Sequence, residues 1–171
     1  MKKNFSTVFI LLATLIVPAS LSAKGPPVKI TIKGGDLSTP IDITDPNILK
    51  EFSVWAGPGV GVNGIAQTEG FIIDWSKGLV VERPDGLHHY EVLFYANHRG
   101  ERLVYVVSYD YNPSTEQGYV YLPGKAEEWY QLNTFSIFRG LEGNWFLATS
   151  AWQNAVRPII ARAKTAHSPR K

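Results

Sequence analysis

Two long segments of alternating hydrophobicity dominate the middle of the chain and constrain its fold more than any other feature. They span residues 88–96 and 102–111 and are joined by the polar sequence Asn-His-Arg-Gly at 97–100. β-Branched and aromatic residues are frequent in both segments, and a short connection that ends in Gly is typical of a β-hairpin. The sequence therefore predicts two long antiparallel strands at the centre of a sheet.

Both faces of this predicted hairpin carry apolar side chains. Simple alternation places Val92, Phe94, Val104 and Val106 on one face, and Leu93, Tyr95, Leu103, Tyr105, Val107 and Tyr109 on the other. A sheet with one solvated face would alternate apolar and polar residues cleanly. We therefore expect the second face to be covered by helices or to be an aromatic surface for a partner.

Shorter alternating segments lie on both sides of the hairpin. Turn sequences such as Pro-Asp-Gly at 84–86 and Pro-Gly at 123–124 separate them. The expected short strands span residues 28–33, 41–43, 71–75, 78–82, 119–122, 135–139 and 144–148, and the last two form a hairpin across residues 140–143. Their order predicts an antiparallel meander.

Two segments have helical periodicity instead. The first is capped by residue 44 or 45, has Pro46 in its first turn and continues to Ala56, before Gly57. The second, residues 150–164, contains Pro158 and has an apolar stripe formed by Trp152, Ala155, Val156, Ile159, Ile160 and Ala163. The fold class we predict is α+β, an antiparallel β-sheet meander flanked by a short N-terminal helix and a C-terminal amphipathic helix.

The first residues have the pattern of a secretory signal peptide. Lys2 and Lys3 precede an apolar run over residues 8–17, and small residues follow up to Ala23. We predict cleavage between Ala23 and Lys24, with cleavage after residue 19 as the alternative. The expected organisation is a signal peptide at 1–23, one domain at 24–164 and a disordered basic tail at 165–171, with the mature protein in the periplasm or outside the cell.

Composition excludes several classes of function. The chain has no Cys, which excludes a disulfide scaffold, a thiolate metal site, a cysteine nucleophile and a lipid anchor. Its 17 basic residues include Lys2 and Lys3, so the mature chain balances the 15 acidic residues. The strands lack interleaved basic residues, and we expect no nucleic-acid partner. No second apolar run is long enough to span a membrane.

Several local motifs, taken in order, resemble a set of small exported bacterial proteins that have no assigned function. The motifs are residues 40–46 (PIDITDP), 55–59 (WAGPG), 118–124 (GYVYLPG) and 139–146 (RGLEGNWF). The resemblance covers most of the mature chain. It implies export and a single small domain, and it carries over no activity, cofactor or site.

A metal site is one hypothesis for the polar residues of the hairpin. His89 and Glu91 are two residues apart, so they share one face of a strand, and imidazole and carboxylate are zinc ligands. His98 lies far along the strand and His88 points to the other face, so a third ligand is missing. We therefore expect no metal and no other cofactor. The acidic residues Asp74, Glu82, Glu91 and Asp110 are a second hypothesis, because paired carboxylates cleave glycosides.

Tyrosines are concentrated in three consecutive predicted strands. Tyrosine combines a flat apolar ring with a polar hydroxyl, which suits sugars, peptides and protein partners. The candidate binding residues are Tyr95, Tyr105, Tyr109, Tyr111, Tyr119 and Tyr121. Core packing and β-propensity are the alternative explanation for all of them. The sequence thus favours an exported, non-enzymatic domain that binds an envelope or extracellular ligand or partner, and the alternative is an envelope hydrolase of glycan or peptide.

Overall fold

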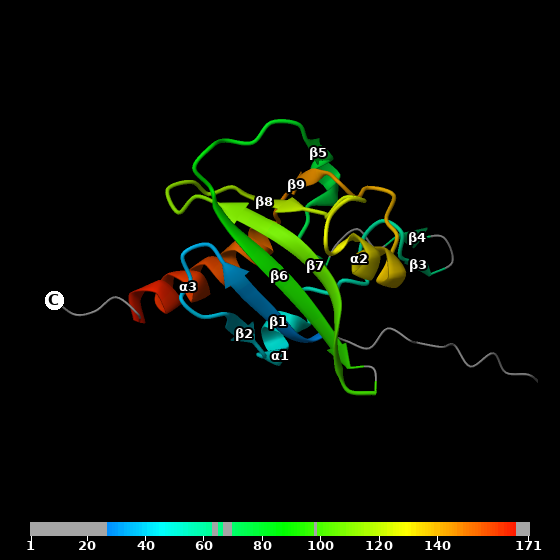
Figure 1. Ribbon diagram of the computed structural model, residues 1–171, viewed down its shortest axis with the longest axis horizontal. Coiled ribbons are helices and arrows are strands. Elements are labelled where there is room, and N and C mark those ends of the chain that lie inside the picture. Colours follow the sequence, from blue (N-terminus) through cyan, green and yellow to red (C-terminus); the bar gives the residue numbers. More distant parts are fainter. Residues whose placement is uncertain (1–26, 63–64, 67–69, 98, 167–171) are drawn as a thin grey trace, which may run out of the picture.

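The computed structural model describes residues 27–62, 65–66, 70–97 and 99–166, so the predicted signal peptide lies outside the described residues. Within them, seven antiparallel strands form one sheet in the order β2-β1-β6-β7-β8-β9-β5 (Figure 1). These strands are β1 (Pro27–Gly34), β2 (Ile41–Ile43), β5 (Leu79–Val80), β6 (His88–Asn97), β7 (Glu101–Tyr111), β8 (Gly118–Tyr121) and β9 (Trp145–Leu147). A separate pair is formed by β3 (Gly61–Val62) and β4 (Ile65–Ala66).

Three α-helices accompany the sheet in the described part of the chain: α1 (Pro46–Leu49), α2 (Tyr130–Ser136) and α3 (Ser150–Ala166). A single 3-10 turn, η1 (Trp75–Lys77), precedes β5. The fold is therefore α+β with an antiparallel sheet, as the alternating segments predict, but the sheet is not the predicted meander, because β6 lies beside β1 and β5 lies at the far edge beside β9. Helix α3 extends into the segment predicted to be a disordered tail, and residues 167–171 lie outside the described residues.

The predicted central hairpin is confirmed as the pair β6–β7. Its register places Val107 opposite Val92 and Tyr105 opposite Phe94, with an irregularity between Phe94 and Tyr95. These four buried residues share one face, so the face assignment from simple alternation is wrong. The length of the connection decides which residues lie opposite each other, and alternation within each strand cannot fix that register.

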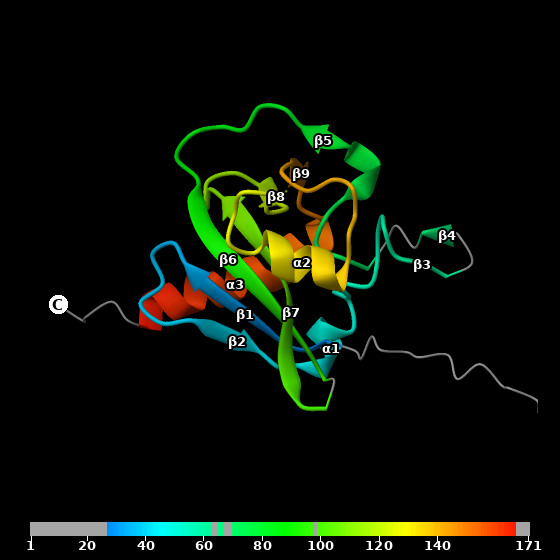
Figure 2. The same ribbon diagram turned by 45° about the vertical axis from the view of Figure 1, so that its right-hand side comes forward.

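One face of the sheet packs against α3 and forms the core (Figure 2). The fully buried ring of Trp152 meets Tyr109 of β7 edge-to-face at 5.9 Å between ring centroids, and Phe52 at 5.1 Å. Val156 and Ile160 are also buried, further along the same side of the helix. The apolar stripe predicted for this helix therefore does cover the sheet.

The first helix is much shorter than its pattern suggests. The side chain of Asp45 caps it by accepting a hydrogen bond from the backbone N–H of Asn47, but the helix ends at Leu49 and not at Ala56. The buried guanidinium of Arg139 explains the difference. It donates hydrogen bonds of 2.7–2.9 Å to the backbone carbonyls of Val54, Ala56 and Pro58. These tertiary hydrogen bonds take the place of helical ones.

Two predicted short strands are wrong. Residues 135 and 136 belong to α2, and β9 pairs with β8 and β5 and not with residues 135–139. Residues 71–75 contribute only an isolated bridge between Ile73 and Ala148 before η1 begins at Trp75. Residues 71–73 are nevertheless buried. Their apolar side chains fill the core without a strand ladder, and periodicity cannot distinguish these two uses of a short apolar run.

Candidate functional site

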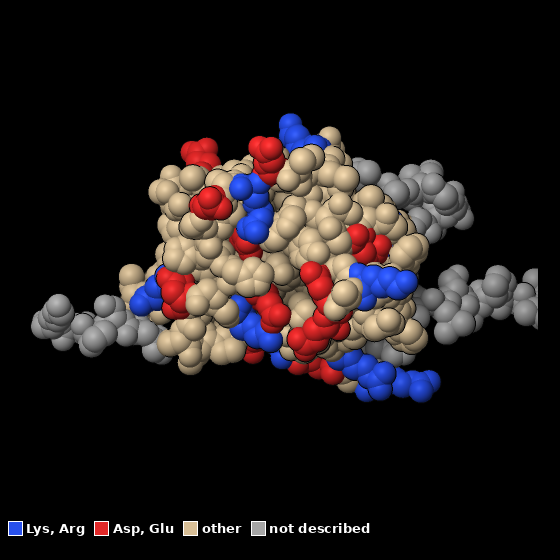
Figure 3. Space-filling view, turned by 45° about the horizontal axis from the view of Figure 1, so that its top comes forward, with Lys and Arg blue, Asp and Glu red and all other residues tan. Residues whose placement is uncertain are grey.

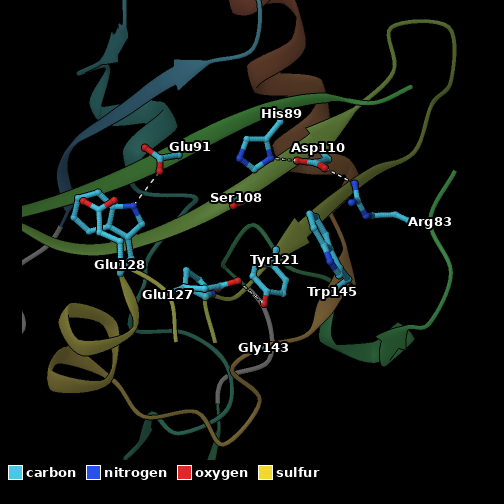
Figure 4. Close-up of a pocket in the computed structure, with 12 residues that line it drawn as sticks. Arg83, His89, Glu91, Ser108, Asp110, Tyr121, Glu127, Glu128, Gly143 and Trp145 are labelled. Atoms are coloured by element: carbon cyan, nitrogen blue, oxygen red, sulfur yellow. Dashed lines mark hydrogen bonds and ion pairs between the residues drawn. The ribbon is translucent and has the colours of Figure 1, made fainter. Parts of the chain in front are cut away.

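A cavity of about 600 Å³ opens on the face of the sheet opposite α3 (Figure 4). Successive side chains of a strand point to opposite faces, so the polar residues between the buried tyrosines of β6 and β7 point into this cavity. The lining residues are Arg83, His89, Glu91, Ser108, Asp110, Tyr121, Pro123, Glu127, Glu128, Trp129, Gly143 and Trp145. We call this cavity the outer-face pocket.

His89 and Asp110 are directly opposite each other on β6 and β7. The Nδ1 of His89 lies 2.7 Å from Oδ1 of Asp110, whose side chain is 5% exposed, while the imidazole is 59% exposed. The guanidinium of Arg83 binds the second oxygen of the same carboxylate. The hydrogen bond to Asp110 raises the pKa of His89 above its ordinary value, against the opposing effect of desolvation.

An aromatic wall stands beside this charged group. The guanidinium of Arg83 lies over the ring of Trp145, 3.9 Å from the ring centroid. On the neighbouring strand, the ring of Tyr121 is 4.9 Å from that of Trp145 at an interplanar angle of 32°. The cross-strand register of β8 and β9 sets this contact because it places the two residues opposite each other.

Glu91 forms the opposite side of the pocket. One of its carboxylate oxygens accepts a hydrogen bond from the indole N–H of Trp129 at 3.0 Å, and the other lies 2.7 Å from Nζ of Lys33. Desolvation acts to raise the pKa of Glu91, but the hydrogen bonds from Lys33 and then Trp129 outweigh it, and the pKa is lowered. Glu91 is therefore an ionised carboxylate with both oxygens occupied.

Glu127 closes the lower side of the pocket as drawn in Figure 4. It accepts hydrogen bonds from the hydroxyl of Tyr121 at 3.1 Å and from the backbone N–H of Gly124 at 2.6 Å. Burial, followed by the bond to Glu127, raises the pKa of Tyr121. The Tyr121 ring is thus fixed between Glu127 and Trp145.

Within the described residues, the pocket groups that remain without a hydrogen-bond partner include the Nε2 atom of His89 and the hydroxyl of Ser108. Figure 4 shows the second ring nitrogen of His89 on the side away from Asp110, facing the space between Glu91 and Ser108. The pocket therefore offers a ligand fixed ion pairs, one available imidazole nitrogen, one hydroxyl and aromatic rings.

The structure separates the predicted tyrosine surface into two sets. Tyr105, Tyr109 and Tyr111 are buried in the core, so they cannot form a binding surface, and this part of the prediction is wrong. Strand alternation places these three side chains on the face of the sheet that points toward α3. Tyr95, Tyr119 and Tyr121 are partly exposed on the other face, and of the three only Tyr121 lines the pocket.

His89 and Glu91 do share a face of one strand, as their spacing predicts. Each is engaged with protein partners, and no group of three possible His, Asp or Glu ligands is found among the residues that the structure describes. Of the acidic candidates, Glu91 and Asp110 both line the pocket. Asp74 instead caps η1 by accepting a hydrogen bond from the backbone of Ser76.

Several lining residues escape the sequence analysis. Arg83, Trp129 and Trp145 come from segments far apart in the chain, and no spacing rule connects them with β6 or β7. The available signal was the pair of polar residues at alternate positions on each central strand, His89 and Glu91 on β6 and Ser108 and Asp110 on β7. Polar residues repeated at that spacing on apolar strands mark a face that is not core.

No protein-family model, curated protein or solved structure matches this chain. Among the described helices, none has the length and apolar character needed to cross a membrane. Figure 3 shows acidic and basic side chains lying next to one another across the face drawn. The outer-face pocket is therefore the feature of this chain that bears most directly on its function.

Proposed function

We propose that this protein is an exported binding domain whose outer-face pocket holds a small, uncharged, hydroxylated ligand such as one or two sugar units. The volume of about 600 Å³ lies in the range of small-molecule sites. The observation that carries the proposal is the combination of mutually neutralised ion pairs on the floor with an aromatic wall formed by Tyr121 and Trp145.

The ion pairs favour an uncharged ligand. Arg83 is paired with Asp110, and Lys33 with Glu91, so an ionic ligand would have to compete with contacts that are already formed. A hydroxyl group both donates and accepts hydrogen bonds, which matches the available His89 Nε2 and Ser108 hydroxyl. Glu128, which is exposed at the rim, can accept from a further hydroxyl.

The aromatic wall favours a ligand with an apolar face. Tyr121 and Trp145 present ring surface beside the polar floor, and Trp129 stands on the other side of the pocket. Aromatic side chains with a polar tip suit ligands that are apolar on one side and polar on the other. A sugar ring has this character, with C–H groups on its faces and hydroxyls around its edge.

Cleavage of a glycan by paired carboxylates has less support. Such a reaction needs one carboxyl group that donates a proton and a second that attacks or activates water. Both oxygens of Glu91 and both oxygens of Asp110 already accept contacts from protein groups. Neither residue is therefore available as a proton donor in the arrangement observed.

The test is a binding titration of the mature chain, followed by tryptophan fluorescence because Trp129 and Trp145 line the pocket. A neutral disaccharide, N-acetylchitobiose or maltose, is compared with dilysine and diglutamate. We expect saturable binding of a neutral sugar that Trp145→Ala abolishes. Phe135→Ala, at an exposed aromatic residue outside the pocket, is the matched control and should bind normally. Tighter binding of either charged peptide would refute the proposed ligand class.

Export is the second part of the proposal and rests on the N-terminal sequence. The charged start, the apolar run of residues 8–17 and the small residues before Lys24 support it. A pocket that recognises hydroxylated ligands is consistent with a location where envelope or extracellular glycans are present.

A further inference from the structure

We infer that His89 is a general base that activates water to hydrolyse an ester group on the ligand, and that Asp110 is its positioning residue. The inference rests on the proposed function, because the ligand must occupy the outer-face pocket. It goes beyond binding by assigning a reaction to the pocket.

The imidazole of His89 is held in a fixed orientation. Its Nδ1 is bonded at 2.7 Å to a carboxylate that is 5% exposed, and Arg83 binds the other oxygen of that carboxylate. The carboxylate therefore has a fixed orientation and fixes the ring in turn. Nε2 is left on the pocket side, as Figure 4 shows, in the position that a proton acceptor for a bound water requires.

The other ionisable groups of the pocket floor are occupied by contacts with protein groups. The oxygens of Glu91, Asp110 and Glu127 each accept a hydrogen bond or ion pair from protein groups. The remaining carboxylate of the pocket, Glu128, is exposed at the rim, which leaves His89 as the proton acceptor on the floor within the part of the chain that the structure describes. An ester is a suitable substrate for a site with one general base, because ester hydrolysis needs one group that removes a proton from water and returns it to the leaving group.

The reaction consumes only water and the ester. Water oxygen forms a bond to the ester carbonyl carbon while one of its protons passes to Nε2 of His89. The bond from that carbon to the alcohol oxygen then breaks, and the imidazolium gives its proton to the departing oxygen. The products are a carboxylic acid and an alcohol.

The groups that face His89 set the pH dependence. They are Asp110 on β7, Glu91 on β6 and Arg83 before β6; the two acids raise the pKa of the imidazole and Arg83 lowers it. Activity should therefore rise with pH through a midpoint above 6.5, the ordinary value for histidine. In Asp110→Asn the carboxylate charge is lost, so this midpoint should move to lower pH. A residue that only supported the fold would not move it.

The experiment measures hydrolysis of p-nitrophenyl acetate by the mature protein and its variants. We expect His89→Gln to lose about 100-fold or more of the activity, the lower end of general-base effects. His88→Gln, a change to the neighbouring histidine outside the pocket, should keep the activity close to that of the wild type. Circular dichroism checks that each variant is folded.

Three results would overturn the inference. If the wild-type protein hydrolyses the ester no faster than His89→Gln, His89 is not the general base. If the midpoint of the pH–activity profile is unchanged in Asp110→Asn, Asp110 is not the positioning residue of His89. An acyl group trapped on Ser108, together with inactive Ser108→Ala, would assign the attack to Ser108 and not to water. Sugar binding is measured separately, so a protein that binds the sugar but does not hydrolyse the ester fails this inference alone, while absence of sugar binding fails the proposed function.

Discussion

The side-chain amide of Asn133 forms two hydrogen bonds with the backbone of Val106. Its Oδ1 accepts from the N–H at 2.8 Å, and its Nδ2 donates to the carbonyl at 2.6 Å. Strand β8 ends at Tyr121, opposite Ser108, so β7 has no β8 partner at this point. The amide thus occupies the place that the peptide group of a longer β8 would take, and it attaches α2 to the edge of the sheet.

We predict that Asn133→Ala lowers the free energy of unfolding by at least about 2 kcal/mol, because each of two buried backbone groups costs about 1–3 kcal/mol when unsatisfied. Urea unfolding followed by circular dichroism measures it. Gln131→Ala, at an exposed position of the same helix, is the control and should have little effect. Equal stabilities of the two variants would show that the amide bridge contributes nothing.

Arg139 should be among the most sensitive positions for stability. Its buried guanidinium donates to the carbonyls of Val54, Ala56 and Pro58 and, at 3.0 Å, to the hydroxyl of Tyr105. We expect Arg139→Lys to lose about 3 kcal/mol or more, since an ammonium cannot reproduce the planar set of donors and each orphaned carbonyl costs about 1–3 kcal/mol. Chemical denaturation checks this, and a lysine variant as stable as wild type would contradict it.

Trp152 should contribute strongly to stability through its contact with the sheet. Its side chain is fully buried between Phe52 and Tyr109, so Trp152→Ala should cost about 3–5 kcal/mol. Arg162→Ala, at an exposed position of the same helix, should change stability by no more than about 0.5 kcal/mol. Thermal unfolding of both variants provides the comparison. An unchanged transition in Trp152→Ala would mean that α3 is an appendage.

His89 should make stability depend on pH. Its pKa is raised in the folded protein, so the contribution of the His89–Asp110 contact is fully present below the unfolded value of about 6.5 and is lost as pH rises through the folded pKa. The stability difference between wild type and His89→Gln should therefore be largest in mild acid and shrink toward alkaline pH. Urea unfolding across this range measures it, and a difference that grows with pH would reverse the predicted sign.

The export prediction is tested by the N-terminus of the secreted protein. We expect Edman sequencing or mass spectrometry to find Lys24 as the first residue, because the small residues that end at Ala23 form the cleavage site. A protein that retains Met1 would contradict export by this route.

The sequence by itself determined the elements that carry their own pattern. The long hairpin of β6 and β7 is visible because alternation and a Gly-containing connection are local properties, and α3 is visible because its buried stripe of Trp152, Val156 and Ile160 repeats at helical spacing. Polar residues at alternate positions of the hairpin, such as His89 and Glu91, were likewise readable as one face of a strand.

Tertiary structure decided the parts whose partners are distant in the chain. The first helix stops early because Arg139, more than 80 residues away, binds the carbonyls of residues 54–58. Register decided that Tyr105 and Tyr109 belong to the core, and the fold brought Arg83 and Trp145 to His89 and Asp110. Local sequence encodes which face of a strand or helix is apolar. Which distant side chain meets that face depends on the complete packing of the chain, so the pocket could not be predicted from sequence alone.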